Sequence, residues 1–354
     1  MVNLEHLGSL FPTLGRKLKK ISLATLPTPL RETRYRPQQQ THTVWIKEDN
    51  LSGVPYGGNK VRKLEYLLQP AIEKQRSRIA TFGAVGSHHA LATALYAKQL
   101  GLNCTVFLSH QTNVPAISSA LRTHLRIGTE IVRFGGAYRE RVRTLRQYVQ
   151  DRNVWVVPAG GSSWLGTLGF IDAGLELAQQ ITTGKMPMPD RVYVATGTMS
   201  TTAGLALGLA LADLSIDIHA VRVSHPSIAN PAVLERLMRK TVTMLKNLDP
   251  TFPAHIAAHT RVTLRNEYFG AGYAHSNAVV DTAIAVAAEQ FDLSLESTYT
   301  GKAMAAMLDD LDHGGSRSSR YLFWNTCHSQ PLASATEIAV NKARLPAEFL
   351  RYLS

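Results

Sequence analysis

The sequence has little cysteine and no long apolar run. Its 354 residues include only two cysteines, Cys104 and Cys327, which lie far apart in the chain. A disulfide framework is therefore not expected, and the composition fits a reducing, cytoplasmic environment. No apolar run approaches the length that a membrane crossing requires. The N-terminal region carries basic residues at 16–20 without a signal-peptide core, so we expect a helical extension there.

Acidic side chains are outnumbered, with 26 Asp and Glu against 38 Lys and Arg and a formal charge of +12. Such an excess is compatible with nucleic acid, an acidic membrane surface or small anions as partners. The basic residues are scattered, however, and no nucleic-acid motif accompanies them. One expected helix carries four arginines that we interpret as a solvated face: Arg139, Arg141, Arg143 and Arg146. We therefore expect no nucleic-acid or membrane partner.

The chain is long enough and apolar enough, at 45% hydrophobic and 18% charged residues, to form two hydrophobic cores. Short β-rich runs alternate with longer helical patterns such as 90–100 and 202–214. This alternation predicts an α/β fold with parallel sheets covered by helices on both faces, and ligands at the carboxyl ends of the strands. The expected strands are 44–47, 79–82, 104–108, 130–134, 154–158, 192–196, 218–223, 262–266 and 321–325.

The segment 56–65, which reads Tyr-Gly-Gly-Asn-Lys-Val-Arg-Lys-Leu-Glu, places Lys60 in a glycine-rich turn where an amphipathic helix begins. The positive end of the helix dipole and partial desolvation both favour the neutral form of a lysine at this position. A neutral amine can attack a carbonyl carbon. A short Gly-Gly-x-Lys motif alone is more often a solvated lysine, so the motif gains weight only from the rest of the chain.

A second loop, within 192–204, leads from an expected strand through Thr-Gly-Thr-Met-Ser-Thr-Thr into a helix of small residues. Backbone N–H groups at a helix N-terminus, a close-approach glycine and several hydroxyls suit a phosphate dianion. The loop lacks the Gly-Lys-Ser/Thr ending of a Walker motif and the Gly-x-Gly-x-x-Gly of dinucleotide sites. A hydroxyl-rich helix start is also common without any ligand, so phosphate binding and plain capping stay open here.

A third loop, 81–90, again joins a strand to a helix and contains Ser87, His88 and His89. Its amides could hold a carboxylate and Ser87 could relay a proton, although a serine there is more often only a helix cap. A serine hydrolase is disfavoured because Gly-x-Ser-x-Gly is absent. A metal site is disfavoured as well, because His255 and His259 lack the intervening Glu of a zinc protease.

A reactive lysine, a cup for a dianion and a carboxylate-binding loop, all on strand ends of one α/β protein, point to pyridoxal phosphate. The chain resembles the fold-type II pyridoxal-phosphate enzymes, the two-domain fold of tryptophan synthase β. Within them it is similar to the branch of D-cysteine desulfhydrase and aminocyclopropane-carboxylate deaminase. The matching motifs follow one order through nearly the whole chain: 26–30, 57–65, 86–89, 158–162, 192–204, 270–273, 299–303 and 325–326.

This resemblance implies a catalytic set and a cofactor site. The catalytic groups it implies are Lys60, Ser87, Tyr273 and Tyr299, with Lys60 bonded to the cofactor. The cofactor-binding residues it implies are Asn59, Lys60, His88, Gly197, Thr198, Met199, Ser200, Thr201, Thr300 and Thr326. A smaller domain at 54–165 should lie against a larger one made of 1–53 and 166–354, with the cofactor in the cleft between them. We expect a homodimer and no metal.

The resemblance also carries departures that bear on the substrate. Thr300 stands where the deaminase branch has a glutamate facing the pyridine nitrogen, as in the desulfhydrase-like branch. A neutral partner there, Thr300 or Thr326, weakens the electron sink and favours loss of a group from Cβ over opening of a cyclopropane. His88 replaces an asparagine that binds the phenolic oxygen of the cofactor, and the sign of that change stays open. Cys327 and His328 replace two glycines.

We therefore expect α,β-elimination on a small β-substituted amino acid, with D-cysteine as the leading substrate and pyruvate and ammonia as products. Two alternatives stay open from the sequence. One is ring opening of aminocyclopropane carboxylate, and the other is a pyridoxal-phosphate binding protein without turnover, which the altered His88 and His328 would motivate.

Overall fold

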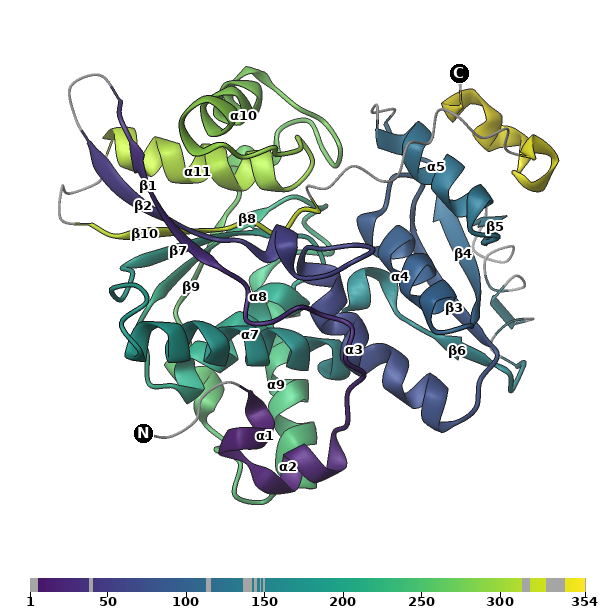
Figure 1. The fold of residues 1–354 in the computed structure, drawn as a ribbon, viewed down its shortest axis with the longest axis horizontal. Coiled ribbons are helices and arrows are strands. Elements are labelled where there is room, and N and C mark those ends of the chain that lie inside the picture. The colour runs from purple at the N-terminus through teal and green to yellow at the C-terminus, as the bar shows by residue number, and fades with distance from the viewer. Residues whose placement is uncertain are drawn as a thin grey trace.

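The computed structural model describes residues 6–37, 41–112, 116–135, 142, 145, 146, 148, 150–313, 319–328 and 341–353. These residues form two separate sheets, which Figure 1 shows side by side. The larger sheet has the order β1-β2-β10-β7-β8-β9, with bounds β1 Leu30–Tyr35, β2 His42–Lys47, β7 Arg191–Thr196, β8 Asp217–Arg222, β9 Val262–Arg265 and β10 Tyr321–Trp324. The smaller has the order β5-β4-β3-β6, with bounds β3 Arg78–Ala84, β4 Asn103–Ser109, β5 Glu130–Arg133 and β6 Val154–Val156.

All nine predicted strands are present, and the strand pairs are parallel except at one edge. There β1 runs antiparallel to β2, with Leu30 opposite Lys47 and Tyr35 opposite His42. β1 is not among the strands predicted from the sequence. Its six residues, Leu-Arg-Glu-Thr-Arg-Tyr, are mostly polar, and only Tyr35 among them is fully buried. An exposed edge strand has little of the apolar signal by which buried parallel strands are found.

Helices cover the sheets on both faces, as expected from the strand-helix alternation. In Figure 1, α10 and α11 lie on one face of the larger sheet, and α7, α8 and α9 lie on the other. The helices are α1 Leu7–Leu10, α2 Pro12–Lys17, α3 Asn59–Glu73, α4 His88–Gln99, α5 Ala116–Arg126, α7 Trp164–Thr182, α8 Ser200–Leu211, α9 Pro231–Leu248, α10 Ala278–Phe291 and α11 Thr300–His313. Short 3₁₀ turns are η1 Asp49–Leu51, η2 Ala159–Gly161, η3 Ile256–His259, η4 Glu267–Phe269, η5 Lys342–Arg344 and η6 Ala347–Tyr352.

The alternating side chains of β10 show why both faces of the larger sheet are covered by helices. Leu322 and Trp324 pack in the core formed with α7, α8 and α9, whereas Tyr321 and Phe323 pack in the core formed with α10 and α11. Successive strand residues point to opposite faces, so a strand that is apolar at every position needs a helix layer on each side. The loops after these strands are thereby left free to form a site.

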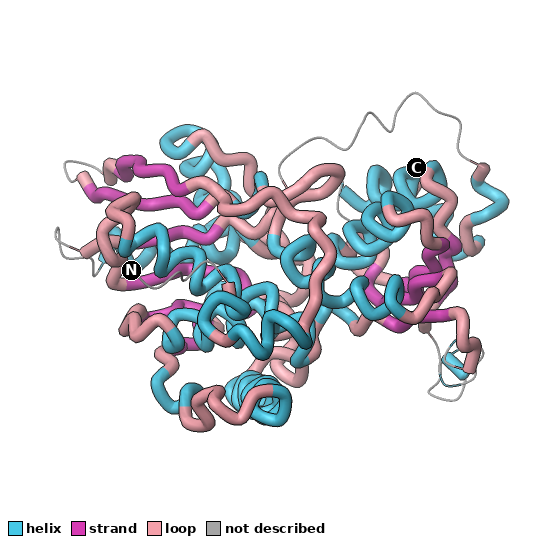
Figure 2. Tube along the Cα trace, turned by 60° about the horizontal axis from the view of Figure 1, so that its bottom comes forward, coloured by secondary structure: helices cyan, strands magenta, loops and turns pink. Residues whose placement is uncertain are grey.

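A third core lies around the smaller sheet, and the tube view of Figure 2 shows the strands gathered in two groups. The C-terminal segment belongs to this core, because Phe349 and Tyr352 are buried in it. The predicted larger domain, 1–53 and 166–354, includes that segment. In Figure 1 the segment lies beside α5, and its apolar side chains belong to the same core as those of α5 and β4. The four strands of the smaller sheet all lie between 54 and 165, and those domain boundaries stay a prediction.

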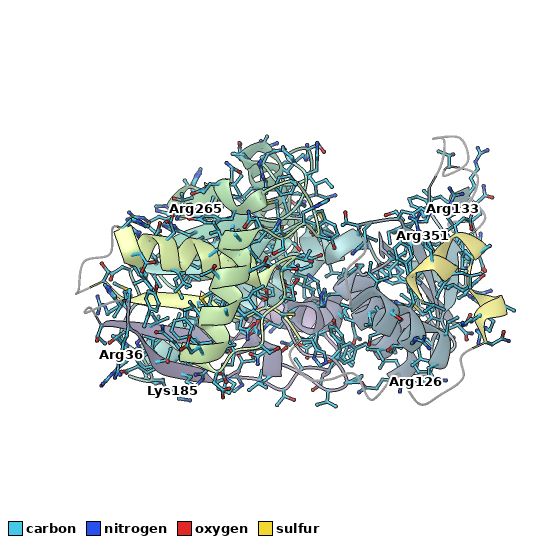
Figure 3. All side chains as sticks on the ribbon, turned by 90° about the horizontal axis from the view of Figure 1, so that it is seen from above. Arg36, Arg126, Arg133, Lys185, Arg265 and Arg351 are labelled. Carbon is cyan, nitrogen blue, oxygen red and sulfur yellow. The ribbon has the colours of Figure 1, made fainter. Side chains whose placement is uncertain are left out.

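The remaining features of the described chain are simple. The N-terminal helices α1 and α2 are present where a helical extension was predicted. None of the helices among the described residues is long and apolar enough to cross a membrane. The six basic residues labelled in Figure 3 are spread from one end of the molecule to the other. Arg139, Arg141 and Arg143 lie outside the described residues, whereas Arg146 is helical and exposed.

Candidate active site

A cavity of about 290 Å³ opens where the strand ends of the two sheets face each other. Loops from both sheets line it, together with the starts of α3, α4 and α8 and the segment just before α11 Thr300–His313. Among the predicted site residues, those at its wall are Asn59, Lys60, Ser87, His88, Gly197, Thr198, Met199, Thr201, Tyr273, Tyr299 and Thr326. Ser200 and Thr300 are buried next to the cavity and are not part of its wall. The three loops singled out in the sequence therefore meet at one place.

Lys60 lies in the first turn of α3, and the turn before it is fixed by the backbone. Gly58 has a φ of 88°, and a Cβ there would come within 2.5 Å of the Thr326 carbonyl oxygen. The Asn59 N–H donates to that same carbonyl at 3.1 Å. Only glycine fits such a left-handed conformation at so close a backbone approach. The glycine turn thus ties the start of α3 to the loop after β10.

The Lys60 amine loses its proton more readily than an exposed lysine. Burial lowers its pKa to about 8, although Cys327 and Glu296 oppose the shift. Its Nζ atom lies 5.8 Å from the centre of the Tyr299 ring, so the phenol covers it. A substantial fraction of the side chain is therefore unprotonated slightly above neutral pH, which is the state that reacts with a carbonyl.

The start of α8 has the free donors that an anion needs. Met199, the residue before the helix, has a φ of 70°, and no side chain caps the first turn. The uncapped N–H groups of that turn are available to a ligand and carry the positive end of the helix dipole. The neighbouring Gly160 is confined too, because a Cβ on it would lie 2.2 Å from the Thr198 hydroxyl.

Lys63 adds a second buried amine, which the sequence analysis did not assign to the site. Its Nζ donates to the Ser200 hydroxyl at 2.8 Å and lies at the cavity wall. Burial and the neighbouring Lys60 hold its pKa well below the ordinary value. An anion bound at the start of α8 would restore the charge of this amine. The spacing from Lys60, three residues along one helix, is the signal that could have revealed it.

Ser87 caps a helix, which is one of the two roles predicted for it. Its Oγ accepts the Ala90 N–H at 3.2 Å and so caps α4, and the serine also lies at the cavity wall. A Cβ at Gly83 would lie 2.5 Å from that oxygen, so glycine is needed there. Because the hydroxyl accepts from the backbone, its own hydrogen remains available to a ligand in the cavity.

Two hydrogen-bonded phenols, Tyr273 and Tyr299, line the cavity and are called the phenol couple below. The hydroxyls of Tyr273 and Tyr299 are 2.6 Å apart, and the rings meet edge to face. Burial raises the pKa of Tyr273 to about 12 and the pKa of Tyr299 further above the ordinary value. Both phenols therefore hold their protons near neutral pH. A hydrogen-bonded pair of protonated phenols can donate a proton or pass one along.

Glu296 is a carboxylate at the cavity wall that the sequence analysis missed. Its oxygens accept the backbone N–H groups of Thr298, Tyr299 and Thr300 at 2.7–2.9 Å, and one accepts the Thr300 hydroxyl at 3.1 Å. Glu296 thus caps α11 and occupies the Thr300 hydroxyl. Of the two threonines that were candidates to face a pyridine nitrogen, only Thr326 lies at the cavity wall.

The donor set fits a molecule with an aldehyde, a phosphate and a polar aromatic ring. The chain offers an amine of lowered pKa at Lys60, uncapped amides at α8 with Lys63 beside them, and a neutral hydroxyl at Thr326. These are the groups that pyridoxal phosphate requires of a protein. Among the described residues there is no group of three or more His, Cys, Asp or Glu that could hold a metal ion.

Comparison with known proteins also indicates pyridoxal phosphate as the cofactor. Residues 21–326 match the family model described as pyridoxal-phosphate dependent enzyme. D-cysteine desulfhydrase of Klebsiella pneumoniae strain 342 is 31% identical over 306 residues, covering 83% of this chain and 89% of that protein. The Salmonella choleraesuis protein of the same name is 29% identical over 303 residues, with the same coverage of both chains.

Solved structures share the fold. The crystal structure of an ACC deaminase homologue has a TM-score of 0.73 and 26% identity, covering 90% of this chain and 94% of its own. A fungal L-serine ammonia-lyase from Rhizomucor miehei has a TM-score of 0.59 at 19% identity, covering 87% and 95%, a likeness of fold alone. The family model spans both sheets and every residue that lines the cavity except Cys327 and His328. The chain therefore belongs to the family of pyridoxal-phosphate dependent enzymes.

Proposed function

We propose that this enzyme catalyses α,β-elimination on a small amino acid with a neutral leaving group on Cβ, D-cysteine being the leading candidate. The products are pyruvate, ammonia and the released substituent. The cofactor supplies the electron sink that makes loss of a proton from Cα feasible. The side chains of the cavity bind the amino acid, hold its carboxylate and move protons.

Each step has a side chain suited to it. Lys60 presents an amine of lowered pKa that would hold the cofactor and, once displaced by the amino group of the substrate, could take the Cα proton. The Ser87 hydroxyl and the amides at the start of α4 are donors for the substrate carboxylate. Lys63 and the start of α8 serve the phosphate. Tyr273 and Tyr299 assist the departure of the β group by giving or relaying a proton.

The observation that carries the proposal is the phenol couple beside the buried amine. The two hydroxyls are 2.6 Å apart and the Tyr299 ring lies 5.8 Å from the Lys60 amine, so acid and base groups share one wall. Elimination needs a base near Cα and an acid near the leaving group. A merely cofactor-binding protein would have no need for this pair.

The charge of the wall limits the substrate class. Among the described residues that line the cavity, Lys60 and Lys63 are the only lysine or arginine side chains. Both have lowered pKa values through burial, and both are engaged by the proposed cofactor contacts. A second carboxylate, such as that of aspartate, would therefore have no cation to pair with and would be costly to bury. The side chain of the substrate should be small and uncharged.

Thr326 favours elimination over ring opening. We propose that its hydroxyl is the neutral partner of the pyridine nitrogen, since Thr300 is already bonded to Glu296 and lies off the wall. A neutral partner leaves that nitrogen less protonated and the electron sink weaker. A good leaving group on Cβ tolerates a weak sink better than a cyclopropane carbon does. The relatives named D-cysteine desulfhydrase agree with this choice.

The test is a product assay with purified holoenzyme. D-cysteine, L-cysteine, D-serine and aminocyclopropane carboxylate are supplied separately, with Lys60→Ala as the control for cofactor-independent decay. Pyruvate from a β-substituted amino acid, at a rate that Lys60→Ala lacks, supports elimination, and the faster of the two cysteine enantiomers assigns the stereochemistry. Formation of 2-oxobutyrate from aminocyclopropane carboxylate without pyruvate from any other substrate would move the protein to the ring-opening alternative. No product from any of them would favour the binding protein.

We also keep the proposals that the protein is a homodimer and acts in the cytoplasm. Light scattering on the eluting peak of a sizing column measures the mass directly. A mass near 39 kDa, the 38.8 kDa of one chain, would contradict the dimer. Fractionation of producing cells tests the compartment.

A further inference from the structure

Beside the phenol couple, the cavity is also lined by three side chains that the proposed elimination does not use, Tyr56, His88 and His328. The Tyr56 hydroxyl lies 2.5 Å from Nδ1 of His88, although the two residues are 32 positions apart in the chain. All three side chains line the cavity. The question is which nitrogen of the His88 ring carries hydrogen, because that decides what the ring offers to a bound molecule.

Nδ1 of His88 is the only hydrogen-bond partner of the Tyr56 hydroxyl among the described residues, so a phenol that keeps its proton donates it there. Burial raises the pKa of the Tyr56 phenol well above the ordinary value, with smaller contributions from Cys327 and Glu296. The phenol is 3% exposed and keeps its proton near neutral pH. Since the hydroxyl donates to Nδ1 of His88, that nitrogen must be the acceptor. The hydrogen of a neutral imidazole then lies on Nε2.

His88 is also held in its neutral form. Burial lowers the pKa of the ring, Lys60 lowers it further, and Glu296 opposes both. His328, on the loop after β10, has its own pKa lowered to about 4 by burial and by His88, so it adds no charge near neutral pH. Tyr299 is protonated as well. The titratable groups that face His88 therefore leave it uncharged.

His328 fixes Tyr56 from the other side. Its ring stacks on the Tyr56 ring with centres 4.1 Å apart and planes 24° apart. Its Nδ1 accepts the Gly57 N–H at 2.9 Å, which anchors the imidazole to the turn before Lys60. The rings of Tyr299 and His88 meet edge to face, with their centres 5.7 Å apart. The hydroxyl of Tyr56 is thus aimed at Nδ1 by a stack and a backbone bond.

We propose that Tyr56 is a positioning residue that fixes His88 as the neutral tautomer with hydrogen on Nε2, so that His88 presents one N–H donor to the bound molecule beside Ser87. His88 is then a donor to an oxygen of that molecule and not a base. This donor role rests on the proposed function. Without Tyr56, either ring nitrogen of a neutral His88 could carry the hydrogen. The tautomer itself does not depend on which substrate is turned over.

The direct test is nitrogen-15 NMR of the histidine rings in the cofactor-free protein, with His88→Asn used to assign the signals of His88. Between pH 6 and 9 the expected pattern is a bare Nδ1 and a protonated Nε2. Tyr56→Phe removes the donor, and a hydrogen bond of this strength biases an equilibrium by about threefold to tenfold. We expect the variant to show a mixture of tautomers and a raised His88 pKa, because the lost bond stabilised only the neutral ring.

A matched control exists elsewhere in the chain. Tyr352 lies 3.1 Å from Nδ1 of His110 in the C-terminal segment, outside the cavity. Tyr352→Phe should alter the His110 signals and leave those of His88 unchanged. A charged His88 at pH 7, hydrogen on its Nδ1 in the wild type, or an unchanged tautomer in Tyr56→Phe would each overturn the proposal.

A cycle of variants in the loaded enzyme separates positioning from general damage. Asparagine has an N–H donor that needs no tautomer to be fixed. Tyr56→Phe should therefore lower kcat/KM by about threefold to tenfold in the His88 protein and by less than about twofold in the His88→Asn background. Equal losses in both backgrounds would make Tyr56 a structural residue only. If no background turns over any substrate, the proposed elimination fails while the NMR result still decides the tautomer.

Discussion

The two faces of α3 differ in whether their buried basic side chains are paired with carboxylates. On the cavity face, Lys60 and Lys63 have no carboxylate within salt-bridge distance among the described residues, and burial lowers both pKa values. On the opposite face, Arg62 is equally buried but bonds to Asp49 at 2.8 Å and to Glu176 at 2.9 Å. The difference is that carboxylates compensate the buried charge of Arg62, whereas no carboxylate pairs with the buried amines of Lys60 and Lys63.

The paired face is a closed network. Lys47 joins it through Glu176 at 2.5 Å and donates to the Thr28 carbonyl at 2.8 Å. Burial alone would raise the pKa of Glu176, but Arg62 and Lys47 lower it to about 2. The network ties α3 to β2 and α7, and so holds the helix that carries Lys60.

The strongest break is Lys60→Ala. Without this amine the protein has no group in place to bond to the cofactor, so covalent attachment and turnover should both disappear. Borohydride reduction followed by peptide mapping checks it, with the label expected on Lys60 in the wild type. A label on Lys63 or Lys302, or cofactor absorbance in Lys60→Ala equal to that of the wild type, would refute the assignment. Lys302 is a fair comparison because its amine is bonded to the Phe269 and Gly272 carbonyls.

The phenol couple gives the next largest effect. Tyr273→Phe or Tyr299→Phe should lower kcat by about a hundredfold to ten-thousandfold, the usual contribution of an acid-base group. The hydroxyls do not hold the phosphate, so cofactor affinity should be unchanged, which absorbance titration measures. Because the two hydroxyls act on each other, the double variant should lose little more than the worse single one. Full activity in both single variants would remove the couple from the mechanism.

Glu176→Gln breaks the paired face instead. It leaves Lys47 and part of Arg62 buried without a counter-charge, which costs about 3–5 kcal/mol of unfolding free energy. Urea unfolding measures that loss. The cavity side chains are untouched, so kcat per folded molecule should stay within about twofold of the wild type. A large loss of kcat with unchanged stability would contradict the division between the two faces.

The free energy of unfolding should depend on pH through Glu176. The folded-state pKa of Glu176 is about 2, below the ordinary value of 4.5, so its stabilisation is complete above about pH 4.5 and is lost as the pH falls towards 2. The difference in unfolding free energy between wild type and Glu176→Gln should therefore be constant from pH 7 to 5 and narrow below that. A difference that stays constant down to pH 3 would show that the charge of Glu176 is not what stabilises the fold.

The sequence predicts the strand-helix order, the three loops and Lys60 because these have local signals. Apolar runs reveal strands, and a glycine turn before an amphipathic run reveals the start of α3. The Arg62 network is different, since Asp49 and Glu176 stand 13 and 114 positions from Arg62 and only the fold brings them together. Tyr56 and His88 meet for the same reason. Burial, which sets the pKa of Lys60, is likewise a property of the packed chain.

The smallest expected effect comes from the same chemical change made at an exposed pair. Glu235 and Arg239 lie one turn apart on α9, with a separation of 3.5 Å and side chains 73% and 69% exposed. Water screens such a pair, and holding two long side chains together costs rotamer entropy, so it contributes at most about 0.5 kcal/mol. Glu235→Gln should therefore change the unfolding free energy by no more than that, and raising the salt concentration should abolish the change. If Glu235→Gln and Glu176→Gln destabilised the protein equally, burial with partners would not explain the paired face of α3.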